Sequence, residues 1–186
     1  HGKRLRIFWP DGPKGECMSH FAVLVFVRPE NQRFLGSTVE NVLGRYDENL
    51  ETEQVCDCVA LCELDHCVKP DPECLYCQGT GVSHFNPDGK WDWWRIGGRY
   101  DGWITDTEVS GDGFNFSHEH ESLKLNSRPV AELLDKIPCA IVTPDGEWHE
   151  NPDPWGDDST GEWDDEVHAL YKQYQDCIAV CVDCHV

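Results

Sequence analysis

Two short cysteine pairs constrain this chain more than any other feature of its sequence. Cys56 and Cys58 are separated by one residue and Cys74 and Cys77 by two, and a Gln-Gly-Thr-Gly sequence follows the second pair. Four thiolates suit tetrahedral zinc, with Zn–S bonds of about 2.3 Å, and glycines let backbone amides turn toward the sulfurs. The spacing therefore predicts a closed, structural zinc site with Cys56, Cys58, Cys74 and Cys77 as its ligands.

This zinc site would close a cysteine-rich loop over residues 51–81, which has few apolar residues from which to form a core. Metal binding would then supply part of the free energy that orders the loop. Cys62, His66 and Cys67 lie between the two pairs and are competing ligands. Reduced thiols or two disulfides are the alternatives to a metal.

The total cysteine content favours a metal over a disulfide framework. The chain has 11 cysteines, an odd number that disulfides within the chain cannot use up. In a reducing compartment, C-x-C and C-x-x-C spacings more often bind metal than form disulfides. We therefore expect a cytoplasmic protein.

The charge balance limits the partners that the chain can bind. Asp and Glu number 35 against 15 Lys and Arg, which gives a formal net charge of -20. Such a field repels phosphate backbones and anionic membranes, so neither direct nucleic-acid binding nor membrane association is expected. It attracts cations or a basic protein surface, including the nucleic-acid groove of another protein. The longest apolar run, 21–27, is also far shorter than the roughly 20 residues of a transmembrane helix.

The pattern of apolar residues indicates several β-strands. Residues 22–27 form a continuous, mostly β-branched run that predicts a central strand buried on both faces. A Pro-Asp-Gly turn predicts a hairpin over 139–150. An aromatic strand is expected over 90–96, with a partner strand over 100–105, and a last strand over 177–184.

Two helices complete the expected fold. Residues 129–137 and 163–174 both carry apolar side chains at helical spacing, and a proline opens the first segment. We therefore expect a single α+β domain over 18–186 with a mixed or antiparallel sheet, two helices packed on one face and the zinc-stapled loop as an insertion. Residues 1–17 are interpreted as an N-terminal extension, and the signals over 31–49 are weak.

Six motifs are spread along most of the chain. They are Met18-Ser-His-Phe21, Tyr46-Asp-Glu-Asn49, Pro72-Glu-Cys-Leu-Tyr-Cys-Gln-Gly-Thr-Gly81, Asn86-Pro-Asp-Gly-Lys-Trp-Asp-Trp-Trp94 with Ile96-Gly-Gly-Arg99, Thr143-Pro-Asp-Gly-Glu-Trp-His-Glu150 and Val182-Asp-Cys-His185. Through them the chain resembles a set of uncharacterised proteins encoded by tailed bacteriophages and their actinobacterial hosts. The resemblance implies a phage or prophage origin, the cytoplasm of an infected host, and Met18 as the native start. It implies no particular activity.

Three histidines in separate motifs form a second candidate metal centre. His20, His149 and His185 are each expected on or beside a strand, so that all three could reach one end of the sheet. Three imidazoles with an open fourth position are a ligand set of catalytic zinc, which lowers the pKa of bound water. The alternative is that these histidines are separate, hydrogen-bonded or exposed residues.

Three further residues would serve this centre. Glu150 and Asp183 are candidates for orienting the histidines or transferring protons. Arg99 follows two glycines at a strand end and is a candidate for binding an anion. Its alternative is an ion pair with one of many acidic neighbours.

Two functions follow as hypotheses. The first is a phage-type zinc protein in which a second metal ion, zinc or another, assists hydrolysis or hydration of a small or anionic substrate. The second is a non-enzymatic acidic protein that imitates nucleic acid and inhibits a basic host or defence factor. The number of bound metal ions and its dependence on the histidines would separate the two.

Overall fold

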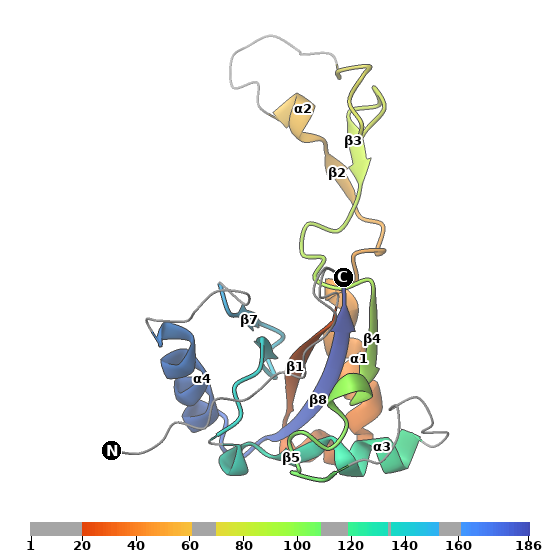
Figure 1. Cartoon of the computed structure of the whole chain (residues 1–186). Coiled ribbons are helices and arrows are strands. Elements are labelled where there is room, and N and C mark those ends of the chain that lie inside the picture. The colour runs from red at the N-terminus through yellow and green to blue at the C-terminus, as the bar shows by residue number, and fades with distance from the viewer. Residues whose placement is uncertain (1–19, 61–69, 109–118, 134, 153–160) are drawn as a thin grey trace, which may run out of the picture.

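A computed structural model of the chain describes residues 20–60, 70–108, 119–133, 135–152 and 161–186 (Figure 1). Its α-helices are α1 (Leu35–Leu43), α2 (Asp57–Ala60), α3 (Glu119–Leu125) and α4 (Glu162–Gln173). Its strands are β1 (His20–Val27), β2 (Glu53–Val55), β3 (Val82–His84), β4 (Trp93–Ile96), β5 (Ser127–Pro129), β6 (Ala140–Val142), β7 (Trp148–Glu150) and β8 (Ile178–His185). Short 3-10 helices are η1 (Pro29–Phe34), η2 (Gly44–Tyr46), η3 (Gly98–Tyr100) and η4 (Val130–Glu132). The expected extension over 1–17 lies outside the described residues.

Strands β1 and β8 form the centre of the main sheet. They pair antiparallel over their full length, from His20 opposite His185 to Val27 opposite Ile178. The strand order is β4-β8-β1-β6-β7, and β5 also pairs with β8. Residues from Ala22 to Val27 are at most 1% exposed, which confirms the predicted central strand buried on both faces.

The alternation of side chains along β1 produces two separate cores. Leu24 and Phe26 point to one face, where they belong to a core that includes residues of α4 and η4. Val23 and Val25 point to the other face, where residues of α1 and α3 complete a second core. The sheet is therefore the middle layer between two groups of helices (Figure 1).

The sheet is mixed because β1 pairs parallel with β6, whereas its other strand pairs are antiparallel. Strands β6 and β7 form the hairpin expected over 139–150, with Ile141 opposite His149. The first strand of this hairpin runs parallel to β1, with Leu24 opposite Ile141, whereas β8 runs antiparallel to β1. The prediction of one α+β domain with a mixed sheet is confirmed.

The two segments predicted as helices pack on the same face of the sheet. α4 agrees with the helix expected over 163–174, and its Trp163 and Val167 share a core with Val130 and Leu133. The segment over 129–137, however, is not the regular helix that was predicted. Its beginning pairs with β8 as part of β5 and continues as η4, because pairing with the sheet overrides the helical spacing of its side chains.

Helix α1 was not anticipated and covers the opposite face of the sheet. Its Val39 and Leu43 are fully buried in the second core, beside Val142 and Val180. The helix has only nine residues, so its apolar spacing is too brief to be distinguished in the sequence. Among the described residues no helix, α1 included, is long and apolar enough to cross a membrane.

The predicted partner strand over 100–105 is replaced by turns. Gly97 and Gly98 have φ angles of 70° and 57°, in the left-handed region that favours glycine, and lead into η3. The chain therefore leaves the plane of the sheet directly after β4. The partner of β4 is instead β8, beginning with Trp93 opposite His185.

Strands β2 and β3 form a separate two-stranded sheet, with Glu53 opposite His84 and Val55 opposite Val82. We call residues 51–60 and 70–85, which include both strands and α2, the arm. The arm extends beyond the end of the main sheet at which β8 ends (Figure 1). The insertion was expected over 51–81.

Replacing Gly97 with alanine tests the turn after β4. A Cβ at this position would lie 1.8 Å from Asp101 Oδ1 and 2.2 Å from Asn126 Nδ2, in a conformation that other residues rarely adopt. We expect Gly97→Ala to lower the free energy of unfolding by about 3 kcal/mol or more, because backbone strain and a side-chain clash add together. Urea-induced unfolding followed by tryptophan fluorescence measures this loss.

Gly161→Ala is the matched control. Gly161 also has a positive φ of 69°, but a Cβ there would meet nothing within 4 Å. Its replacement should therefore cost only the backbone contribution of about 1–2 kcal/mol. Equal losses in the two variants would show that the side chains of Asp101 and Asn126 do not constrain the turn.

Candidate metal centre

The arm brings together two cysteine pairs that are distant in sequence. Cys56 follows β2 and Cys58 lies on α2, whereas Cys74 and Cys77 lie in the turns that precede β3. The amide of Cys56 donates to the carbonyl of Gly81 at 2.9 Å, which extends the pairing of β2 with β3 up to the cysteines. The two-stranded sheet therefore holds the two pairs at a fixed separation.

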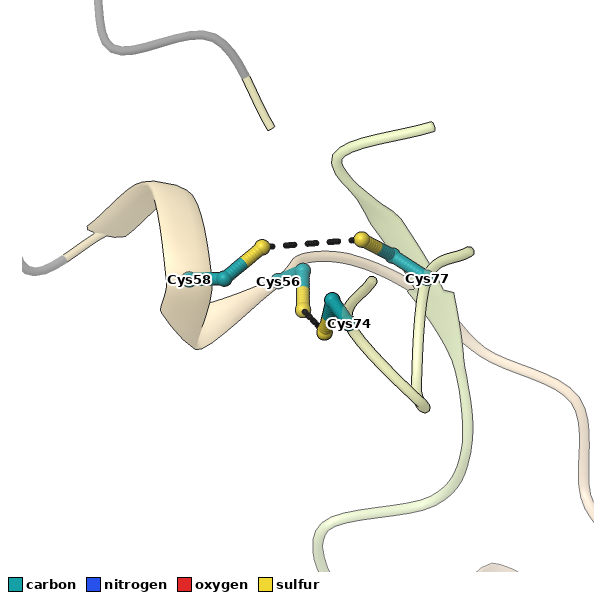
Figure 2. Close-up of side chains that lie close together, drawn as sticks. All are labelled: Cys56, Cys58, Cys74 and Cys77. Carbon is teal, nitrogen blue, oxygen red and sulfur yellow. Dashed lines mark hydrogen bonds between the residues drawn. The ribbon is translucent and has the colours of Figure 1, made fainter. Parts of the chain in front are cut away.

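The four sulfurs have the spacing of a tetrahedral thiolate site. The Sγ atoms of Cys56 and Cys74 are 3.6 Å apart, those of Cys58 and Cys77 are 3.5 Å apart, and all four lie within 4.8 Å of one another (Figure 2). Zn–S bonds of about 2.3 Å place the sulfurs of a tetrahedron about 3.8 Å apart. The four cysteines are free, since a disulfide would require an S–S distance of about 2.05 Å. They can therefore hold a metal ion such as zinc.

The turn through Cys74 and Cys77 contains positive φ angles, a backbone conformation that favours glycine. The amide of Gln78 donates to the carbonyl of Cys74 at 2.9 Å, and Gln78 and Gly79 both have positive φ angles, of 50° and 82°. A Cβ at Gly79 would also lie 3.1 Å from Pro72 Cα. Glycine therefore satisfies both the left-handed backbone and the close approach of the preceding chain.

Hydrogen bonds give the thiols of this cluster different acidities. Burial acts to raise the pKa of Cys77, but the amides of Gly81 and Gly79 and the thiol of Cys58 outweigh it and lower that pKa to about 7. The Asp71 amide acts to lower the pKa of Cys58, but burial and the neighbouring thiols raise it to about 12. A cation must displace protons from such thiols, so metal binding weakens as the pH falls.

Two of the three predicted histidine ligands also lie together, at the end of the main sheet. His20 and His185 are directly opposite each other in the pairing of β1 with β8, and their ring centroids are 4.9 Å apart. Nδ1 of His20 is 2.9 Å from Asp183 Oδ1, and Nδ1 of His185 is 2.6 Å from Asp92 Oδ1. Each imidazole is thus held by its own carboxylate.

The third predicted ligand, His149, lies elsewhere, and the reason is the register of the sheet. His149 is opposite Ile141, which is opposite Leu24, four residues beyond His20 on β1. Four residues correspond to about 13 Å along a strand, and the two intervening strand spacings add about 10 Å across the sheet. Nδ1 of His149 is instead 2.9 Å from Glu166 Oε1 on α4. The structure does not bring His149 together with the other two histidines.

The residues predicted to assist catalysis are also separated. Glu150 accepts hydrogen bonds from Lys90 Nζ at 2.9 Å and Trp148 Nε1 at 2.8 Å, on the β7 edge of the sheet. Asp183 does contact His20, as the prediction of an orienting carboxylate requires. Arg99 contributes its backbone amide, which donates to Asp183 Oδ2 at 2.9 Å, whereas its side chain is exposed.

Two residues at this histidine pair were missed in the sequence. Asp92 holds His185, and the Trp93 ring centroid is 5.8 Å from that of His20. The sequence shows an acidic residue within the expected aromatic strand, but only the pairing of β4 with β8 makes Asp92 a neighbour of His185.

The four cysteines form the one group of three or more potential metal ligands within the described parts of the chain. The competing ligands Cys62, His66 and Cys67 lie outside those parts. No family model matches the chain, and no curated protein and no solved structure matches it.

One zinc ion should bind tightly per chain, and replacement of one cysteine should abolish this. We expect Cys77→Ser to lose the tightly held zinc, because serine is a poor ligand and the remaining three thiols leave the tetrahedron incomplete. Elemental analysis of the desalted protein measures the zinc content. Cys139→Ser is the matched control, since Cys139 lies beside β6 rather than in the arm, and full zinc content in Cys77→Ser would contradict the assignment.

Removal of zinc should loosen the arm but leave the main sheet folded. Among described residues of the arm, those buried are Cys56, Cys77 and Ser83, so the arm has little core of its own. With a chelator and a reductant present, we expect protease cleavage to appear within 51–85, while circular dichroism of the sheet and its unfolding temperature change little. Cooperative loss of the whole fold upon chelation would show that the arm and the sheet depend on each other.

Proposed function

We propose that the protein is a zinc-dependent binding protein whose arm contacts a basic partner protein. The observation that supports this most is the position of Leu75 and Tyr76, which lie between two candidate zinc ligands and are 89% and 77% exposed. The cation shapes the turn that carries both side chains. Zinc would therefore act on binding by organising a contact surface and would not take part in chemistry.

The arm exposes further large apolar side chains besides those of Leu75 and Tyr76. Phe85 is 43% exposed and its ring centroid is 6.4 Å from that of Tyr76, and Val55 is 65% exposed. Large apolar side chains that gather on a surface usually mark an interface. Tyrosine at the centre of such a contact buries a large area at a low cost in side-chain entropy.

The charge of the arm indicates the chemistry of the partner. Its described residues include Glu51, Glu53, Asp57, Asp71 and Glu73 and no Lys or Arg. A zinc ion with four thiolates adds a further net charge of about -2. The partner is therefore a protein with an apolar site bordered by basic residues, consistent with the whole chain's net charge of -20. The resemblance to phage proteins suggests that it is a host or defence factor.

Metal-assisted hydrolysis of a small or anionic substrate is the second candidate. It is favoured by the two carboxylate–histidine pairs at the end of the sheet, His20 with Asp183 and His185 with Asp92. It takes second place because His149 lies on a different part of the sheet and Glu150 is engaged by Lys90. The candidate thus retains two of its three proposed metal ligands.

Binding should depend on the exposed residues of the arm. The zinc-loaded chain is used to recover a partner from an actinobacterial extract, and the purified partner is then titrated by calorimetry. We expect the double change Leu75→Ser with Tyr76→Ser to weaken binding at least about tenfold, because the central apolar contact is lost, and we expect affinity to fall with increasing salt.

Phe34→Ser is the matched control, since Phe34 is also apolar and 54% exposed but lies on η1, outside the arm. It should bind as the unchanged chain does. A partner whose affinity is the same for the Leu75/Tyr76 variant would show that the arm is not the contact surface.

A further inference from the structure

The pairing of β1 with β8 places two imidazoles at the distance that a shared metal ion requires. His20 and His185 are directly opposed, where Cβ atoms are about 4.5–5.5 Å apart. Their ring centroids are 4.9 Å apart. Two imidazoles that bind one tetrahedral ion through bonds of about 2.0–2.1 Å have centroids about 5 Å apart. The observed separation suits such an ion.

Both rings already carry the outer partner that metal-bound histidines use. The carboxylates of Asp183 and Asp92 occupy Nδ1 of His20 and His185, at 2.9 and 2.6 Å. Metal-ligating histidines almost always donate their second ring N–H to a carboxylate, carbonyl or water, which fixes the tautomer and the direction of the ring. This arrangement leaves Nε2 of each ring as the ligating nitrogen.

Asp183 is itself held in one position. Its side chain is 2% exposed, and Oδ2 accepts a hydrogen bond from the amide of Arg99 at 2.9 Å. Gly98 permits this approach, because a Cβ there would lie 2.5 Å from the same oxygen. A buried carboxylate is costly unless its oxygens are hydrogen-bonded, and here both are used. The orientation of His20 is thus determined before any ligand arrives.

The surroundings favour a transition-metal cation. The side chains of His20 and His185 are 15% and 33% exposed, so an ion can reach them from solvent. The net charge of -20 raises the local concentration of cations. Imidazole nitrogens suit Zn²⁺, Ni²⁺ and Cu²⁺, whereas Mg²⁺ and Ca²⁺ prefer oxygen ligands.

We propose that His20 and His185 bind one divalent transition-metal ion through their Nε2 atoms, with Asp183 and Asp92 orienting the rings. Two protein ligands leave the other positions of the ion to water, so the site is open and weaker than the four-cysteine site. It lies on the main sheet, and it does not depend on the function proposed for the arm.

Zn²⁺ itself is the probe. The full chain is first loaded with one equivalent of zinc at the cysteines and then titrated with further Zn²⁺, by calorimetry and by long-range ¹H–¹⁵N spectra of the histidine rings. We expect a second, weaker equivalent that shifts the Nε2 resonances of His20 and His185 while their Nδ1 nitrogens stay protonated. His20→Gln and His185→Gln should each weaken this second binding at least about tenfold, because each removes one of two ligands.

Two further variants distinguish the loss of a metal ligand from the loss of an orienting carboxylate and from the loss of a histidine elsewhere on the sheet. Asp92→Asn keeps both ligands but removes a carboxylate, so the affinity should fall about tenfold while both Nε2 resonances still move. His149→Gln is the control and should bind as the unchanged chain does. The proposal is overturned if the unchanged chain gives no second binding heat and no histidine shift, a result that needs no variant to fold. Unaltered second binding in both His20→Gln and His185→Gln would overturn it equally.

Discussion

The antiparallel pairing of β1 with β8 is the interaction on which the other features of the molecule depend. Its eight residue pairs align two strands that are buried on both faces, so each strand contributes to two cores at once. A shift of one residue would exchange the two faces and place Leu24 and Val25 in the wrong cores. The same register that satisfies the cores sets His20 opposite His185. The histidine pair is thus a direct consequence of how the hydrophobic strands align.

The main sheet and the arm are stabilised by different means. The sheet buries long apolar side chains such as Leu24, Phe26 and Ile141 completely. The described part of the arm instead leaves Leu75, Tyr76 and other large apolar residues exposed. A segment that exposes its apolar side chains cannot be ordered by burial, and four converging thiols offer metal binding as the substitute. Metal binding would thus allow the arm to keep its apolar side chains exposed and still hold one structure.

Local patterns in the sequence were sufficient for β1, β8, the β6–β7 hairpin, α4 and the cysteine cluster. For the strands, the hairpin and the helix, one short segment carries the whole signal: a continuous apolar run, a Pro-Asp-Gly turn or a helical face. For the cluster, two short cysteine spacings, C-x-C and C-x-x-C, each carry half of it. Helix α1 was missed because it is short, and the other features that were missed depend on pairing between distant segments. The start of the segment over 129–137 has helical spacing but joins β8, and Asp92 gains its role only from the pairing of β4 with β8. His149 was misplaced for the same reason, since strand membership alone does not give the position along the sheet.

Asp183 shows where the structure departs from what stability alone would select. It lies in the central strand between Val182 and Cys184, where an apolar residue would pack without the cost of burying a carboxylate. Its two oxygens are satisfied by His20 and by the amide of Arg99, and the amide can approach only because Gly98 lacks a side chain. The turn at Gly97 and Gly98 leads residues 100–105 away from the sheet and places the amide of Arg99 beside Asp183. A local departure from the strand pattern therefore coincides with a buried carboxylate and an oriented histidine, which is the combination expected of a functional site.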